Sequence, residues 1–476
     1  MIETVNTLGQ TAIDRLAHWS LAREPAYRQP LALAQAKLLV LDSIGCAFAA
    51  HATGAVDGVI AAVREWGGAP EATIVGVPGK TSVLNAVLAN GGLVRVLDLN
   101  DIMFAEKEGA LAVAGHRSDN IPVALAIGEK FGLPGVALLE SIVMNYELYG
   151  RLRQLMPEDS PWDGSSVSGL VAAAMAGRLM GLDEGRQSNA LALAAARTAV
   201  PQIVRKGEMS AGKSLANALV AQSGTMGALL AAKGVTGPRE ALEHEDGLHQ
   251  VFDPKRDLAR LWAKPAQPLE ILSSHMKSYP SIGTSQTMAT AALDLRARLG
   301  DRLDAVERID VTMADVPAIR KQQADRKRSD PRTREAADHS FTFLPCVTLV
   351  DGELTTRQFD NDRWLDPAVR RLMERVVLGV DADLRDRAPG SMPCRLTVRL
   401  KDGETISSEC LYPPGHSFAD KGLDPGAVIA KFHAVTREIV ADKPRQRIVD
   451  EAMALDKAAS VAGLMQAVSG EAVGRR

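Results

Sequence analysis

The sequence contains few of the residues that build metal clusters or nucleic-acid platforms. Four cysteines lie far apart, with no CxxC or Cys/His spacing, which argues against a zinc site or an iron–sulfur cluster. These cysteines are Cys46, Cys346, Cys394 and Cys410. Aromatic residues make up only 4% of the chain, and a net charge of -3 is spread over interspersed acidic and basic residues. The composition therefore argues against nucleic acid as a partner.

The sequence also suggests no uninterrupted apolar run of membrane-spanning length. The most apolar stretches, residues 168–182 and 217–232, are broken by Arg, Gln or Gly, so we expect no membrane span. The first helical stretch carries charges throughout and does not resemble a secretion signal. We therefore predict a cytoplasmic protein that works without a membrane.

Several well-known catalytic motifs are absent from the sequence. No GxSxG elbow, Walker loop or GxGxxG after a strand occurs. The segment His244–His249 resembles a metalloprotease helix, but its histidines are five residues apart rather than four and a glycine lies between them. We reject a metal site there, and no metal or organic cofactor is predicted.

The pattern of apolar residues predicts two kinds of structure. Helical spacing runs over residues 29–50 and 55–66, and small-residue helices follow almost continuously from 81 to 234. After Lys264 the pattern alternates over residues 308–313 and 393–412, and Asp402-Gly403 forms a hairpin turn in the second of these. We predict a mainly α protein with a smaller α+β domain.

One stretch, residues 91–130, concentrates polar groups at helix ends. Asp98 and Asp101 follow an apolar helix, and His116 precedes another that Asp119 or Asn120 would cap. A helix N-terminus with an adjacent His and Arg suits a carboxylate or phosphate. The alternative is that the aspartates are solvated turn residues and that the polar run is only a cap.

Three more segments contain polar side chains next to apolar stretches of sequence. Asp163 and Ser165 precede a helix of Ala and Met and either cap it or line a site. Lys213 starts a helix, where its charge opposes the helix dipole, so it needs an anionic partner. Lys277 and Tyr279 follow the change of composition, where a cleft between domains would lie, although a plain linker would look the same.

The ordered set of segments resembles the 2-methylcitrate dehydratase family, also called MmgE/PrpD, whose members include cis-aconitate decarboxylases and iminodisuccinate epimerases. The segments that carry the resemblance are LDSIGCAFAA, VRVLDLND, the GH-S-PVALAIGE stretch, NYELYGR, the Lys213 segment, KSYPS, ADHSFTFLPCVTLVDGELT and YPPGHSFAD.

The resemblance implies an all-helical domain, residues 1–268 with 415–476, and an α/β lid domain, residues 269–414. It also implies a homodimer that acts on a small carboxylate without metal or cofactor. The shared chemistry is removal of a proton next to a carboxylate, which needs a base and cations that stabilise the enolate. A lyase of the dehydratase kind is the first expectation. The alternatives are an epimerase, a decarboxylase and a catalytically silent member of the family.

By resemblance, Asp98, His116, Lys213 and Lys277 are the catalytic candidates. We expect the two lysines to bind the carboxylate and the enolate, and His116 to act as acid/base. Asp98 either orients His116 or acts as a second acid/base. Asp101, Asp163, Ser165 and Tyr279 are the substrate-binding candidates.

The chain departs from the family at four positions. Asp163 and Ile282 stand where histidines are usual, Ala318 where a tyrosine is, and Asn100 where the first loop has a second Asp. We therefore expect poor turnover of 2-methylcitrate and a substrate with fewer negative charges, for instance one with an amine that Asp163 would hold.

Overall fold

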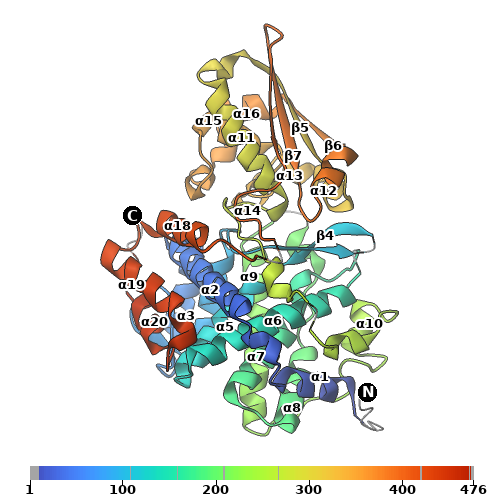
Figure 1. Ribbon diagram of the computed structural model, residues 1–476, viewed down its shortest axis with the longest axis vertical. Helices are drawn as coiled ribbons and strands as arrows, with labels where there is room; N and C mark the ends of the chain where they lie inside the picture. Colours follow the sequence, from blue (N-terminus) through green and yellow to red (C-terminus); the bar gives the residue numbers. More distant parts are fainter. Residues whose placement is uncertain are drawn as a thin grey trace.

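The computed structural model describes residues 10–107, 109–157, 159–206, 209–265, 267–418, 421–470 and 472. They form a mainly helical protein with a smaller sheet-containing part, as the sequence predicts (Figure 1). The helical body, drawn at the bottom, lies under a lid that carries the main sheet. The first nine residues, part of the predicted N-terminal helix, lie outside the described residues.

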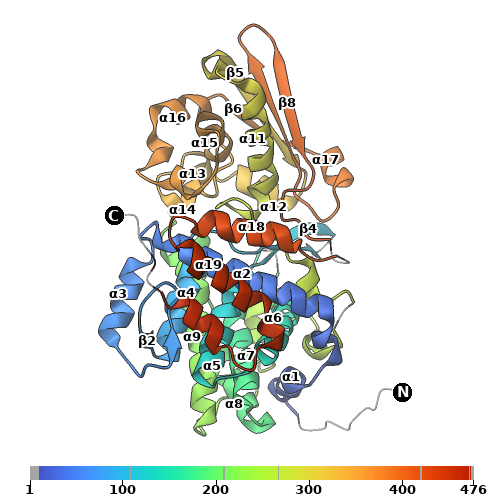
Figure 2. The same ribbon diagram turned by 60° about the vertical axis from the view of Figure 1, so that its left-hand side comes forward.

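The body is built from helices of the N-terminal half and from three helices at the C-terminal end. Its helices are α1 (Ala12–Leu21), α2 (Pro30–His51), α3 (Asp57–Trp66), α4 (Val83–Arg95), α5 (Ile121–Lys130), α6 (Gly135–Leu155), α7 (Ser168–Met180), α8 (Glu184–Ala195), α9 (Gly212–Ala232), α10 (Leu248–Phe252), α18 (Pro425–Thr436), α19 (Asp442–Met453) and α20 (Ala462–Val468). Figure 2 shows the C-terminal helices lying across α2. Small side chains let these helices approach closely; a Cβ on Gly91 of α4 would lie 2.7 Å from the Cβ of Ala218 in α9.

The lid wraps helices around a four-stranded sheet of order β6-β5-β7-β8, in which β5 and β6 are parallel and the other pairs antiparallel. The strands are β5 (Val306–Ala314), β6 (Val376–Asp381), β7 (Cys394–Leu400) and β8 (Thr405–Cys410). The helices are α11 (Gln286–Leu299), α12 (Pro317–Gln323), α13 (Arg326–Ser329), α14 (Arg334–Ala337), α15 (Phe343–Asp351), α16 (Pro367–Met373) and α17 (Ala382–Arg387). The predicted hairpin is confirmed, with Gly403 at a φ of 91° in its turn.

Two large apolar cores divide the described chain, beside a small cluster of Val200, Ala216 and Val220. The body core holds buried residues from Ala12 to Met276 and returns at Leu423, whereas the lid core runs from Met288 to Cys410. The connecting segments therefore cross between the cores at about residues 277–287 and 411–422. Residues in these crossings and beside them lie where the two parts meet.

The stretch after α4 interrupts the almost continuous helices that the sequence suggests from 81 to 234. The strands β3 (Met103–Lys107) and β4 (Ala110–Gly115) pair as an antiparallel hairpin, separate from the small pair β1 (Ala72–Thr73) and β2 (Lys80–Thr81). Local propensity misled the prediction, because ALAVAG is rich in helix-forming alanine. Phe104 and Leu111 pack against the lid core, and that packing accounts for the strands.

Two further expectations need correction. Asn120 occupies the N-cap position of α5, but its side chain donates to Asn145 instead of capping, and Asp119 accepts from other side chains. The expectation about apolar runs was also wrong, since α2 and α9 are long and apolar enough to cross a membrane by length and composition. Core helices pass the same test, and 78% of the tested window in α2 is buried inside the protein.

Candidate active site

The site is centred on Asp98, which follows the C-terminal end of α4 in a left-handed conformation with a φ of 49°. Aspartate tolerates this region better than most residues, but it still costs about 1 kcal/mol. The turn points the carboxylate back toward Arg95, whose Nη1 donates to Oδ1 at 2.8 Å. Both side chains are buried. The helix end therefore fixes a carboxylate inside the protein rather than at its surface.

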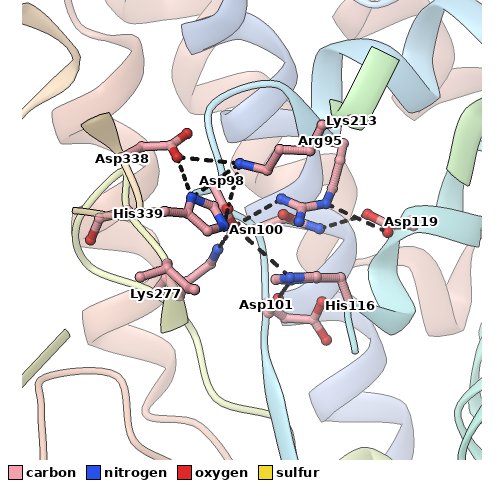
Figure 3. Close-up of polar contacts among 12 residues, drawn as sticks. Arg95, Asp98, Asn100, Asp101, His116, Asp119, Lys213, Lys277, Asp338 and His339 are labelled. Carbon is pink, nitrogen blue, oxygen red and sulfur yellow. Dashed lines mark hydrogen bonds and ion pairs between the residues drawn. The ribbon is translucent and has the colours of Figure 1, made fainter. Parts of the chain in front are cut away.

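Lysines from two distant segments meet this carboxylate, as Figure 3 shows. Lys277, in the crossing to the lid, donates to Oδ1 of Asp98, and Lys213, at the start of α9, lies 3.5 Å from Oδ2. Lys213 also donates to Asp338 at 3.2 Å. The anionic partner that the helix start requires is thus a pair of carboxylates, one from the body and one from the lid.

The balance of charge explains which of these groups are ionised. Burial opposes ionisation of Asp98, yet the charges of Arg95, Lys277 and Lys213 hold its pKa well below the usual range. Burial lowers the pKa of Lys277 to about 8 and also lowers that of Lys213, against the pull of the carboxylates. Three cations face two ionised carboxylates, Asp98 and Asp338, so the cluster has a positive charge in surplus for an anion.

His116 presents an unprotonated nitrogen to this cluster. Its Nδ1 lies 2.6 Å from the backbone carbonyl of Asp101, which can only accept, so Nδ1 carries the hydrogen. Burial lowers the pKa of His116 well below its usual value, and the charges of Arg95 and Lys277 add to this. The ring is therefore neutral, and its Nε2, 3.9 Å from Oδ1 of Asp98, is available as a base.

A second imidazole, which the sequence reasoning missed, lies on the lid side. His339 contacts Asp338 through Nδ1, and its Nε2 lies 3.5 Å from Oδ2 of Asp98. Burial and the ammonium of Lys213 lower the pKa of His339 to about 4. Burial opposes ionisation of Asp338, but the charges of Lys213 and His339 lower its pKa. Nδ1 of His339 also lies 3.1 Å from Nζ of Lys213, so this nitrogen faces both an ammonium and a carboxylate.

A further carboxyl group, Asp119, lies behind Arg95. Burial raises the pKa of Asp119 to about 7, although the charge of Arg95 opposes the shift. Asn100 donates to Asp119 at 2.9 Å, and Asn217 of α9 donates to its other oxygen. Asn100, which replaces the acidic residue that the resemblance implies, thus positions a buried carboxyl group.

The predicted substrate-binding residues divide into two groups. Asp101 lies outside the cavity lining: it accepts hydrogen bonds at 2.6 Å from Ser118 and Ser274 and at 2.7 Å from Tyr146. Tyr279 bonds through its hydroxyl to Thr290 at 3.3 Å and packs on the lid core. Both therefore support the surrounding structure, while Asp163 and Ser165 line the cavity next to the cluster.

Asp163 is not a free anion, contrary to the expectation that it would hold an amine. It caps the 3₁₀ turn Gly164–Val167, accepting from the backbone N–H of Ser165 at 3.0 Å, so the capping interpretation is confirmed. Arg205 Nε also donates to it at 2.9 Å. Burial opposes ionisation, but Arg205 and Ser165 lower the pKa of Asp163 to about 2. Its charge is therefore compensated within the protein.

The cavity that joins these groups has a volume of about 440 Å³ and is walled by both the body and the lid. Asp98, His116 and His339 lie at its buried end. Ile282 and Ala318 line it too, so the departures from the family pattern fall on the cavity wall. A larger hollow of about 800 Å³, beside α8 and residues 238–248, lacks a comparable cluster of buried titratable groups among its described lining residues.

One arrangement in the cluster resembles a metal site. Ligand atoms of Asp98, Asp338 and His339 lie within 4.8 Å of one another, a spacing that could hold a cation. However, the ammonium of Lys213 lies within 3.5 Å of both carboxylates and already compensates their charge. A divalent ion would have to displace or deprotonate that lysine, so the donor set favours ion pairing over metal binding.

Comparison with known proteins connects this geometry to a family. The family model of the MmgE/PrpD N-terminal domain matches residues 14–261, and that of the C-terminal domain matches residues 279–457. Cis-aconitate decarboxylase of Mus musculus is 26% identical over 80% of this chain and 78% of its own length. The 2-methylcitrate dehydratase of Cupriavidus necator is 25% identical (81% and 82%), and that of Salmonella typhimurium is 23% identical (94% and 93%).

Proposed function

Because the chain belongs to the MmgE/PrpD family, we propose that it is a lyase that removes a proton next to a carboxylate of a small polycarboxylate. The relatives are named as dehydratases and decarboxylases, and their low identity leaves the particular reaction open to proposal. The observation that carries the proposal is the unprotonated Nε2 of His116, which faces the cavity beside a cluster of cations.

The arrangement supports the first step of such a reaction in three ways. Nε2 of His116 accepts the proton, and Asp98, 3.9 Å away, stabilises the imidazolium that forms. Lys277 and Lys213 are buried beside Asp98, outside the cavity lining, and their charges offset the negative charge that develops on the substrate as the proton leaves. The buried cavity end keeps these charges away from bulk water, where they would be screened.

We place this chain among metal-independent dehydratases, in which the substrate then loses the hydroxyl group of the neighbouring carbon. The proton held on Nε2 of His116 returns to that hydroxyl, so the products are an alkene and water. The apolar side chains of Ile282 and Ala318 make 2-methylcitrate a poor fit, because polar partners that the family resemblance leads us to expect are missing. We expect a related acid with an uncharged portion at that wall.

A second candidate, an epimerase, is favoured by one observation. Nε2 of His339 lies 3.5 Å from Oδ2 of Asp98, and Nε2 of His116 lies 3.9 Å from Oδ1, so the two imidazoles approach different oxygens of the carboxylate (Figure 3). Two bases around one carbon allow a proton to leave on one face and return on the other. Such an enzyme would need no leaving group.

Incubation in deuterated water with citrate-like, aconitate-like and amino-dicarboxylate substrates tests the proposal. Elimination gives an ultraviolet-absorbing alkene, decarboxylation releases carbon dioxide, and epimerisation incorporates deuterium without either product. The matched control is His116→Gln, which keeps a polar side chain but removes the base. If none of these substrates exchanges a proton or reacts with the parent protein, the proposed function is wrong.

A further inference from the structure

The outer part of the cavity differs from the buried end, because it is lined by guanidinium groups from three separate segments. The exposed fraction of side chains rises from 2% at Asp98 to 19% at Arg205 and 15% at Arg328. Arg153 comes from α6, Arg205 ends the 3₁₀ turn Gln202–Arg205, and Arg328 belongs to the lid helix α13. The body and the lid both contribute to this basic wall.

Arg153 has no carboxylate partner among the described residues. Its Nη1 donates to Sδ of Met156 at 3.1 Å, and its Nη2 donates to the carbonyl of Val113 at 3.5 Å. Its Nε is buried without a hydrogen bond. The guanidinium lies against the backbone of Gly164, where a Cβ would come within 3.1 Å of Cζ. A partly buried cation with only neutral partners gains from an anion.

Arg205 and Arg328 line the same cavity, and each has a carboxylate partner within the protein. Arg205 is paired with Asp163, and Nε of Arg328 lies 3.2 Å from Asp325. Nη1 of Arg328 is buried and has no hydrogen-bond partner in the described part of the chain. Burial lowers the pKa of Arg328 against the pull of Asp325 and Asp338, and repulsion from Arg205 adds a smaller contribution. An anion between them would relieve this repulsion.

We propose that Arg153, Arg205 and Arg328 form a subsite for a second carboxylate of the substrate, remote from the reacting carbon. The assignment of the reacting end rests on the proposed function. Planar guanidinium groups match carboxylates with two parallel hydrogen bonds, which gives the subsite directional specificity. The substrate is then a dicarboxylate or tricarboxylate held at both ends of the cavity, and its outer carboxylate bridges the body and the lid.

Calorimetric titration of the full-length protein with glutarate and pentanoate tests this, since these probes have equal chain length and differ by one carboxylate. We expect Arg328→Gln and Arg153→Gln each to weaken glutarate binding by about tenfold or more, because a hydrogen bond to a charged group is lost. Pentanoate binding should change by less than about twofold. Lys327→Gln is the matched control, because Lys327 is exposed on the same helix and lies outside the cavity lining.

Three results would overturn the subsite: glutarate binding no tighter than pentanoate binding in the parent, equal losses for both probes, or the same loss in Lys327→Gln. Thermal unfolding identifies any variant that fails to fold. Arg328→Lys keeps the positive charge but lacks the planar guanidinium with its two parallel donors, so it should restore part of the glutarate affinity. Failure of the proposed function is distinguishable. In that case no substrate exchanges a proton, yet the preference for glutarate still depends on Arg328.

Discussion

Nδ1 of His116 donates to the backbone carbonyl of Asp101 at 2.6 Å, and this bond determines which ring nitrogen serves as a base. The carbonyl is itself held in place, because the Asp101 carboxylate accepts from Ser118, Tyr146 and Ser274. Asp101 therefore acts through the histidine that it orients. Its role is that of a positioning residue rather than a substrate ligand.

Replacement of the base gives the first prediction. His116→Gln should reduce turnover by a factor on the order of 10²–10⁴, because the variant lacks a general base. The measurement is the rate of deuterium exchange or product formation at saturating substrate. His244→Gln, at an exposed histidine remote from the cavity, serves as the control. If the rate of His116→Gln stays within about threefold of the parent rate, another group removes the proton.

Lys213→Ala is expected to affect stability as well as turnover. Removal of the ammonium leaves Asp98 and Asp338 buried without their shared cation, which typically costs about 3–5 kcal/mol of unfolding free energy. Turnover should fall by about a hundredfold or more. Urea unfolding and steady-state kinetics measure the two effects.

The double variant Lys213→Ala/Asp338→Asn separates the effects of Lys213 on stability and on turnover. It should recover part of the stability, because one uncompensated carboxylate is gone, but it should not recover turnover. Recovery of both would mean that Lys213 has only a structural role.

Much of the fold could be predicted from the sequence because its patterns are local. The apolar periodicity of α2 and the alternation in β7 and β8 each determine an element without help from distant residues. The hairpin β3–β4 could not be predicted, since its alanine-rich strand is stabilised by contacts of Phe104 and Leu111 with a core that forms much later in the chain.

The candidate site was predictable only in part, for the same reason. Asp98 and His116 stand out as polar residues at helix ends. Asp338 and His339 lie in ADHSFTFLPCVTLVDGELT, a segment that carries the family resemblance but whose local pattern does not mark these two residues as part of a site. Only the fold brings them to Asp98. Similarly, the sequence shows that Asp163 replaces another residue, but not that Arg205, 42 positions later, neutralises it. The signal for such partners is a pair of opposite charges in separate apolar segments, which is too common to be specific.

The buried carboxyl group of Asp119 predicts a pH dependence of stability. Its folded pKa, about 7, lies above the ordinary aspartate value of 3.8, so the folded state binds more protons between these values. Its contribution is fully present below about pH 4 and is lost as pH rises toward 7, by at most about 1.4 kcal/mol per pH unit. Asp119→Asn should therefore lose less stability than the parent between pH 4 and 7 in urea unfolding. Parallel curves for parent and variant would contradict the assignment.

Chelation should leave the activity intact. Lys213 occupies the space between the two carboxylates that could otherwise hold an ion with His339. Turnover after exhaustive dialysis against EDTA should equal that of the untreated protein, with an EDTA-treated zinc enzyme as the positive control. Loss of turnover that one divalent ion restores would show that a metal displaces the lysine.

The last prediction concerns Lys431 of α18, which links the C-terminal part of the chain to the site. Its Nζ pairs with the buried Asp42 at 2.6 Å and donates to the carbonyl of Leu99 at 2.8 Å. Leu99 directly follows Asp98, whose left-handed conformation needs such support. Lys431→Met keeps the length of the side chain but releases the loop and leaves Asp42 without its cation.

We expect Lys431→Met to be less stable by about 3 kcal/mol and to turn over more slowly, with a shifted pH–rate profile, because Asp98 no longer holds its place beside His116. The double variant Asp42→Asn/Lys431→Met removes the uncompensated charge and should regain stability. It should not regain turnover, since the bond to Leu99 is still missing. Lys443→Met, at an exposed lysine of α19, is the control and should match the parent. If the double variant regains both stability and the parent pH–rate profile, Lys431 serves only to neutralise Asp42, and the loop holds Asp98 without it.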